Sequence, residues 1–160
     1  MRDTTLLFLT KTSETGVITD ICLAMKKRGF GAGRWNGTGG KTESGETIKD
    51  AVVRETQEEI DVTVSEMSKV AELTFTFPHK PEWDQLVHVF FADEYAGTPT
   101  ESEEMKPSWF AVADIPYDDM WPDDRLWLPH VLEGKYVRAA FSFAEGDVIV
   151  SQEVNIVTEL

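Results

Sequence analysis

The sequence is poor in cysteine and has no long apolar run. Its 160 residues include one cysteine, Cys22, so an internal disulfide is excluded and a reducing compartment is expected. No apolar stretch approaches the roughly 20 residues that span a bilayer. The N-terminal residues also lack the apolar segment of a signal peptide. We therefore expect an intracellular, cytoplasmic chain that has no membrane partner.

Basic residues are also scarce, since 29 acids stand against 15 bases and give a formal charge of −14. Such a chain repels polyanions at long range, so binding to DNA or RNA polymers is not expected. Hydrophobic residues make up 41% of the chain, enough for one folded domain over residues 1–160. No apolar stripe is left over after the expected elements are assigned, so we expect a monomer.

Short apolar and β-branched runs separated by turn residues predict strands, with a hairpin at each end of the chain. The expected strands cover residues 4–10, 17–25, 69–77, 86–95, 107–112, 137–143 and 147–154. Residues 46–60 contain no Gly or Pro and predict a helix. Residues 122–132 predict a second helix, with Pro122 in its first turn, Gly134 at its C-terminal end and a kink or early stop at Pro129. Strands outnumber helices, which predicts an α/β fold with a mixed sheet flanked by helices.

Glycines and basic residues are both concentrated in one part of the chain. Seven of the 11 glycines fall within residues 29–45, and residues 26–41 carry five bases and no acid. Glycines let backbone N–H groups approach an anion closely, and the bases supply opposite charge. This combination favours a phosphate-binding loop. The competing interpretation is a glycine-rich hairpin whose bases are solvated.

The helix that follows carries three carboxylates on one face. Glu55, Glu58 and Glu59 share an arc of roughly 100° and flank the buried side of the helix. Like charges at this spacing repel each other unless a cation neutralises them. Oxygen ligands on a rigid helix suit Mg²⁺ or Mn²⁺. A solvated acidic face is the competing interpretation.

The complete string around these acids decides between the two interpretations. Residues 40–46, a seven-residue spacer and residues 54–62 resemble the Nudix box, G-x5-E-x7-R-E-U-x-E-E-x-G-U, where U is aliphatic. Every acid and the arginine are in register over residues 40–62. Thr56 stands where an aliphatic residue is usual, and its methyl group can still pack. Asp61 replaces the glycine after the helix, where we expect a left-handed backbone that Asp tolerates.

The resemblance extends beyond the box to residues 25–37, 97–99, 101–105 and 119–124. These segments are similar to the MutT-type Nudix hydrolases that act on oxidised purine nucleoside triphosphates. The resemblance implies an α/β/α sandwich and dependence on Mg²⁺, for which Mn²⁺ substitutes. It also implies hydrolysis of triphosphates of the 8-oxo-dGTP and 2-hydroxy-dATP class to the monophosphate and pyrophosphate. The biological role implied is sanitation of the nucleotide pool.

The same resemblance assigns the catalytic residues. Glu59 is the first choice for the essential metal ligand, with Glu58 or Glu104 orienting the attacking water. Arg54 is expected to brace the carboxylates through ion pairs. The implied metal ligands are the Gly39 carbonyl, Glu55, Glu58, Glu59 and Glu104.

Nucleotide binding is assigned in the same way. Lys26 and Lys41 are the expected phosphate contacts. The remaining expected substrate-binding residues are Thr5, Phe30, Asn36, Thr38, Gly39, Gly40, Phe75, Phe77, Trp121, Asp123 and Asp124. Two adjacent carboxylates facing one purine edge force one of them to hold a proton, so Asp123 and Asp124 together offer both a donor and an acceptor. A helix start with Asp near its positive end is the competing interpretation.

Two other functions remain open. One is a Nudix activity on ADP-ribose, a dinucleoside polyphosphate or a modified adenine nucleotide. The other is a non-catalytic nucleotide sensor, supported only by the departures at Thr56 and Asp61. Thr38 and Gln85 also depart from the related pattern, and we expect them to affect purine preference rather than phosphate chemistry. Packing roles are expected for Cys22 and for the tryptophans Trp83, Trp109 and Trp127.

Overall fold

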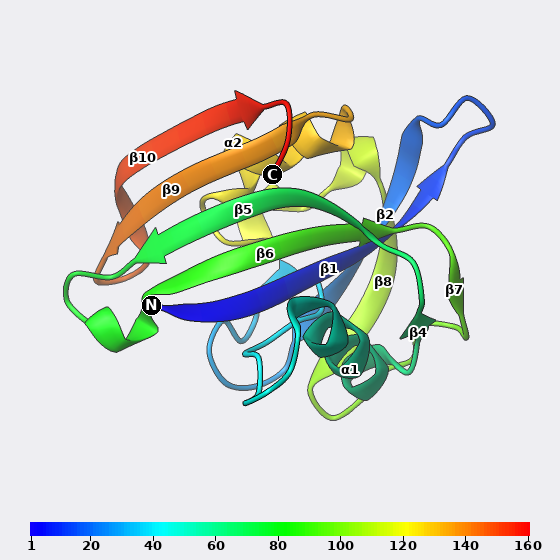
Figure 1. Ribbon diagram of the computed structural model, residues 1–160, viewed down its shortest axis with the longest axis horizontal. Coiled ribbons are helices and arrows are strands. Elements are labelled where there is room, and N and C mark those ends of the chain that lie inside the picture. Colours follow the sequence, from blue (N-terminus) through cyan, green and yellow to red (C-terminus); the bar gives the residue numbers. More distant parts are fainter.

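The computed structural model describes residues 1–160 and contains ten β-strands and two α-helices (Figure 1). The helices are α1 (Ile48–Ile60) and α2 (Asp124–Leu132), and single 3-10 turns cover Pro81–Trp83, Val112–Asp114 and Tyr117–Asp119. The strands are β1 (Arg2–Thr12), β2 (Ile18–Lys26), β3 (Trp35–Asn36), β4 (Thr63–Val64), β5 (Ser68–Thr76), β6 (Gln85–Ala92), β7 (Tyr95–Ala96), β8 (Met105–Ala111), β9 (Tyr136–Ala144) and β10 (Val148–Val157). No helix is long and apolar enough to cross a membrane.

Eight of the strands form one mixed sheet, as the sequence predicts. Its order is β10-β9-β5-β6-β1-β2-β3, and β8 pairs with β2 beside this path. β1 runs parallel to β6, and β5 runs parallel to β9, whereas the other neighbours are antiparallel. The parallel pairs bring distant segments together, since Arg2 of β1 lies opposite Gln85 of β6. The two predicted hairpins, β1–β2 and β9–β10, are both present.

The two helices pack on opposite faces of the sheet (Figure 1). Phe8 of β1 belongs to the larger apolar core, which contains Trp127 and Leu128 of α2. Its neighbours Leu7 and Leu9 belong to the smaller core, which α1 covers. Side chains alternate along a strand, so consecutive residues of β1 supply the two cores. The architecture is therefore the predicted α/β/α sandwich.

Local capping sets both ends of α1. The Thr47 hydroxyl accepts from the Asp50 N–H (3.1 Å), so the helix begins at Ile48 and not at residue 46 as predicted. Asp61 ends the helix in the left-handed conformation (φ 58°, ψ 41°), and its N–H donates to the Gln57 carbonyl. The expected left-handed backbone at Asp61 is confirmed.

Two other elements differ from the prediction. The strand expected over residues 86–95 is interrupted after Ala92, and Tyr95 starts the separate strand β7. α2 begins at Asp124, so Pro122 precedes the helix rather than occupying its first turn. The helix is short and contains Pro129, as expected, and Gly134 follows it with φ +90°.

Candidate active site

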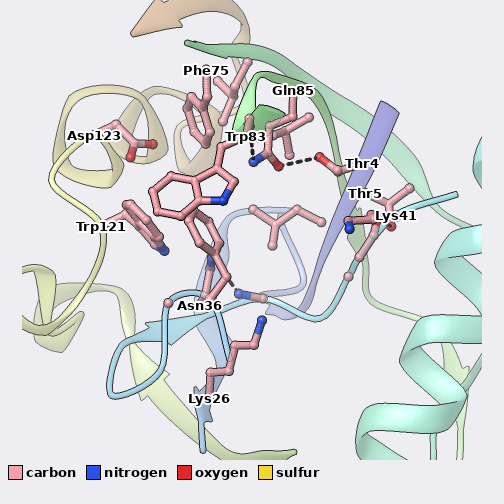
Figure 2. Close-up of a pocket in the computed structure, with 18 of the residues that line it drawn as sticks. Thr4, Thr5, Lys26, Asn36, Lys41, Phe75, Trp83, Gln85, Trp121 and Asp123 are labelled. Carbon is pink, nitrogen blue, oxygen red and sulfur yellow. Dashed lines mark hydrogen bonds between the residues drawn. The ribbon is translucent and has the colours of Figure 1, made fainter. Parts of the chain in front are cut away.

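A cavity of about 460 Å³ lies between β1, the glycine-rich loop and the segment that precedes α2 (Figure 2). All the expected substrate-binding residues line it except Thr38. These residues are Thr5, Lys26, Phe30, Asn36, Gly39, Gly40, Lys41, Phe75, Phe77, Trp121, Asp123 and Asp124. The fold thus gathers residues from four separate stretches of the sequence around one cavity.

Two buried carboxylates form the deep end of the cavity. Asp123 is fully buried and Asp124 is 3% exposed. The Trp127 indole N–H donates to Asp123 Oδ2 (2.8 Å), whereas Asp123 Oδ1 and Asp124 Oδ2 have no hydrogen-bond partner. Asp123 precedes α2 but its side chain does not cap the helix. The hydrogen-bonding capacity of these two buried oxygens is therefore unused within the protein.

Burial also changes the protonation of this pair. Loss of solvent raises the pKa of both carboxyl groups, and the charge of Asp123 raises the pKa of Asp124 further. The pair therefore holds one proton more readily than two exposed carboxylates would. Both directions agree with the shared proton expected from the sequence, which stays a prediction.

Aromatic rings form the wall next to the carboxylates. The Phe30 ring lies 5.1 Å from the Trp121 ring and 5.1 Å from the Trp83 ring, measured between centroids. The Arg34 guanidinium lies over the Trp121 ring, with Cζ 4.2 Å from the ring centroid. The same guanidinium forms a salt bridge with the Asp147 carboxylate (2.8 Å). These rings pack against one another and offer apolar aromatic surface on which a planar ring can stack.

Trp83 packs against the larger apolar core, as expected, but its side chain also lines the cavity, which the sequence did not predict. In Figure 2 it lies between the Asp123 side and the Lys41 side of the cavity. Gln85 holds this segment: its amide donates to the Trp83 carbonyl (3.1 Å) and its oxygen accepts from the Thr4 hydroxyl (2.9 Å). No local pattern signals this placement, since it depends on how the connection between β5 and β6 folds back.

The opposite end of the cavity is basic. Lys26 and Lys41 lie away from Asp123 (Figure 2), and Arg2 and Arg34 also line the cavity, although the whole chain carries −14. Gly39 lies near this end, and close packing explains why the residue is a glycine. A Cβ at this position would lie 1.8 Å from the Thr5 carbonyl oxygen. This end therefore gathers cationic side chains, which suits phosphate groups.

The carboxylates of α1 lie next to this basic end. Glu59 is buried and accepts from the Gly39 N–H (3.3 Å). A Cβ on Gly40 would lie 2.8 Å from Glu55 Oε1, so the loop backbone runs directly against these acids. Burial, and then mutual repulsion with neighbouring acids, raises the pKa of Glu59, and burial raises that of Glu55. A pair of this kind attracts a cation.

Arg54 braces the acids. Its Nε and Nη2 donate to the two carboxylate oxygens of Glu46 (2.8 and 3.0 Å), and its Nη1 lies 2.9 Å from Glu55 and 3.4 Å from Glu58. The Arg54 guanidinium lowers the pKa of Glu46 to about 2, with help from the Glu43 N–H. Arg54 therefore contacts carboxylates and the Lys41 carbonyl (3.2 Å), in keeping with the bracing role expected of it.

Glu104 approaches from the loop between β7 and β8, where Arg28 lies 3.7 Å from its carboxylate. No group of three acidic, histidine or cysteine side chains converges closely enough to enclose a metal ion. The charge of Glu104 nevertheless contributes to the raised pKa of Glu59. All the nearby donors are oxygens, a chemistry that fits Mg²⁺ or Mn²⁺.

Thr38 is buried outside the cavity. Its hydroxyl lies 3.0 Å from the hydroxyl of Thr56 on α1 and 3.5 Å from the Leu7 carbonyl oxygen. Two of the four residues that depart from the related pattern, Thr38 and Thr56, are thus in contact with each other.

Comparison with known proteins gives consistent results. The sequence model described as the NUDIX domain matches residues 2–131. The oxidized purine nucleoside triphosphate hydrolase of Mus musculus is 50% identical over 131 residues, which make up 82% of this chain and 83% of that protein. The protein of the same name in Danio rerio is 46% identical over 140 residues, or 88% of this chain and 89% of that one.

Among solved structures, the MutT protein of Bacillus halodurans superposes with a TM-score of 0.82. The alignment covers 97% of this chain and 98% of that chain at 23% identity. The likeness extends to the whole fold.

Proposed function

The chain belongs to the Nudix hydrolase family, and we propose that it hydrolyses oxidised purine nucleoside triphosphates to the monophosphate and pyrophosphate. Relatives 46–50% identical over most of their length carry that activity in their names, which supports the proposal. Its role would be to remove damaged precursors from the cytoplasmic nucleotide pool. A buried, unpaired Cys22 is compatible with that compartment.

One observation carries the proposal. A single cavity has two buried carboxylates with unpartnered oxygens at one end and cationic side chains at the other. A nucleoside triphosphate has the matching polarity, with a hydrogen-bonding base at one end and a polyanion at the other. Aromatic rings of Phe30 and Trp121 lie between the two ends, where a purine would stack.

Base reading is assigned to Asp123 and Asp124. A pair that holds one proton presents one donor and one acceptor to a purine edge. Moving that proton between the two carboxyls exchanges the donor and the acceptor. The same cavity would then accept the edge of an oxidised guanine or that of an oxidised adenine.

Metal binding is assigned to the Gly39 carbonyl with Glu55 and Glu59, and Glu58 and Glu104 complete the set. Nudix hydrolases use divalent metal ions, and the all-oxygen donor set favours Mg²⁺ with Mn²⁺ as a substitute. When bound, the ion supplies positive charge that polarises the phosphate and makes a water more acidic. Arg54 holds Glu55 and Glu58 in place, and Lys26 and Lys41 bind the polyphosphate.

The test compares pyrophosphate release from 8-oxo-dGTP, 2-hydroxy-dATP, dGTP and ADP-ribose in the presence of Mg²⁺. We expect strong preference for the two oxidised purines and a loss of about 10³-fold or more in Glu59→Gln, because an uncharged amide is a poor ligand for a hard cation. ADP-ribose as the preferred substrate would leave the metal site and contradict the base assignments. Tight nucleotide binding without Glu59-dependent turnover of any substrate would favour the sensor.

We also propose that the chain acts as a monomer on a small nucleotide and not on a nucleic acid polymer. The net charge of −14 supports the absence of polymer binding, because a negatively charged surface outside the cavity repels a polyanion. Light scattering of the purified chain and a competition assay with duplex DNA test the two parts.

A further inference from the structure

Two buried hydroxyls join the glycine-rich loop to α1 beside the acidic cluster. Thr38 is 4% exposed and Thr56 is fully buried, and their Oγ1 atoms lie 3.0 Å apart. Both positions hold other residue types in the related pattern. An aliphatic pair would fill this space without any directional bond, so the hydroxyls need a separate explanation.

The hydrogen bond between the two hydroxyls joins the loop to the helix at 3.0 Å, and either hydroxyl can be its donor. The Thr38 hydroxyl also lies 3.5 Å from the Leu7 carbonyl oxygen. Thr38 is also fixed to β1 through its backbone, because its N–H donates to the Leu7 carbonyl (2.9 Å) and its carbonyl accepts from the Leu7 N–H (2.7 Å). The chain of bonds therefore ties α1 to the central sheet through the loop.

The position of this chain relates it to the acids. Thr56 directly follows Glu55 and lies three residues before Glu59, and Thr38 directly precedes Gly39. Arg54 secures the outer side of α1 to the loop through the Lys41 carbonyl (3.2 Å). On the inner side, the Thr38–Thr56 bond at 3.0 Å is shorter than the bond from the Gly39 N–H to Glu59 at 3.3 Å.

The rest of α1 contacts the sheet through apolar side chains such as Val52 and Ile60. Apolar contacts are non-directional and permit small shifts of the helix along or about its axis. Repulsion among the acids favours such shifts whenever no cation is bound. A hydroxyl pair fixes both distance and direction at this point.

We propose that Thr38 and Thr56 are positioning residues, whose hydrogen bond holds the Gly39 carbonyl at a set distance from Glu55 and Glu59 for divalent-metal binding. The inference rests on the proposed function, in that these groups are the metal ligands. Thr38 and Thr56, which both depart from the related pattern, would act together, because the hydrogen bond needs both hydroxyls.

The test uses Thr38→Val, Thr56→Val, the double variant and Thr56→Ser. Valine has nearly the shape of threonine, so packing is kept and only the hydroxyl is lost. Mn²⁺ binding is measured by electron paramagnetic resonance on nucleotide-free protein, together with the melting temperature in chelator. Each valine variant is expected to bind Mn²⁺ about 10-fold more weakly, and the double variant no more weakly than the worse single one, because both remove the same bond. Thr56→Ser keeps the hydroxyl and should bind like wild type.

The matched control is Thr10→Val, which removes a buried hydroxyl of β1 far along the strand from Thr5. It should leave Mn²⁺ binding unchanged. In turnover, the valine variants at positions 38 and 56 should lower kcat and leave KM for the nucleotide unaffected.

Valine variants that melt lower but bind Mn²⁺ with wild-type affinity would overturn the inference in favour of simple packing. If Thr56→Val fails to fold, Thr38→Val and Thr56→Ser still decide the question through the same binding measurement. Wild-type protein that neither binds Mn²⁺ nor shows Glu59-dependent hydrolysis would overturn the proposed function as well. Wild-type protein that does both, with unchanged valine variants, would overturn this inference alone.

Discussion

Asp124 lies where folding and the proposed recognition of the base make conflicting demands. Two carboxyl groups share a buried site, and solvent exclusion raises the pKa of both. An unfolded Asp has a pKa of about 3.9, so above that pH the folded chain binds more protons than the unfolded chain does. The free energy of unfolding must then fall as the pH rises from about 4 through the raised folded pKa.

Asp124→Asn should remove this pH dependence, because an amide donates to Asp123 as a protonated carboxyl does and never ionises. We expect the variant to melt about 2–6 °C above wild type at pH 8, on the scale of 2–4 °C per kcal/mol for a domain of this size. The difference should shrink toward pH 4. Thermal unfolding followed by circular dichroism between pH 4 and 9 measures it.

The control for this prediction is Asp119→Asn, an exposed carboxylate on the 3-10 turn before the same segment. It should track wild type at every pH. Parallel pH profiles for Asp124→Asn and wild type would mean that the pair carries no shared proton. The expected loss of activity in Asp124→Asn, with retained stability, would show that this carboxyl serves the ligand rather than the fold.

The connection between β5 and β6 carries Trp83, a cavity residue that no sequence pattern predicted. Its turn is closed by the Lys80 N–H to the Phe77 carbonyl (2.8 Å) and by the Phe77 N–H to Asp84 Oδ1 (2.7 Å). The Lys80 ammonium lies 4.2 Å from the Trp83 ring centroid. These contacts hold the Trp83 ring in place before any ligand arrives, which lowers the entropic cost of binding.

Trp83→Ala should raise KM for the nucleotide about 10-fold, since stacking of a base on an aromatic ring contributes about 1–3 kcal/mol. The acids of α1 are untouched, so kcat should change by less than about threefold. Trp83→Phe retains a ring and should show most of the wild-type affinity. Steady-state kinetics on the preferred nucleotide test this, and a fall in kcat at constant KM would contradict a role in binding.

Elements with a strong local signal were predictable from the sequence, and their relative placement was not. The helix at residues 48–60 has a cap residue, apolar spacing and no breaker, so its type and the shared face of Glu55 and Glu59 follow from local rules. The two-residue strands β3, β4 and β7 are too short to show any periodicity. The parallel pairing of β1 with β6 joins residues more than 80 positions apart, which no local pattern specifies.

The same distinction applies to the site. Resemblance to the Nudix box located the acids of α1, because motif spacing fixes them, and the resemblance outside the box indicated most of the expected residues that line the cavity. Trp83 was missed because its environment depends on the path of a connecting segment. Thr56 was judged by its methyl group alone, and the hydroxyl partner 18 residues earlier becomes visible only when the loop is folded against the helix.

The whole molecule carries −14 but distributes this charge unevenly. Cations gather around one end of the cavity, and beside them the acids of α1 and Glu104 repel one another. A bound divalent cation would relieve that repulsion in the folded state, whereas the unfolded chain spreads the same acids apart. Binding to the folded state alone stabilises it by mass action.

Mg²⁺ at ten times its dissociation constant should therefore raise the melting temperature by about 3–6 °C, from about 1.4 kcal/mol of binding linkage. The comparison requires NaCl at equal ionic strength, because any salt screens a chain of this charge. Chelation of Mg²⁺ should reverse the shift, and Glu59→Gln should reduce it to less than half. Differential scanning calorimetry on both proteins makes the measurement. An equal shift in wild type and Glu59→Gln would mean that Mg²⁺ stabilises the molecule through its general surface charge, because a specific site on α1 cannot lose a buried carboxylate without losing affinity.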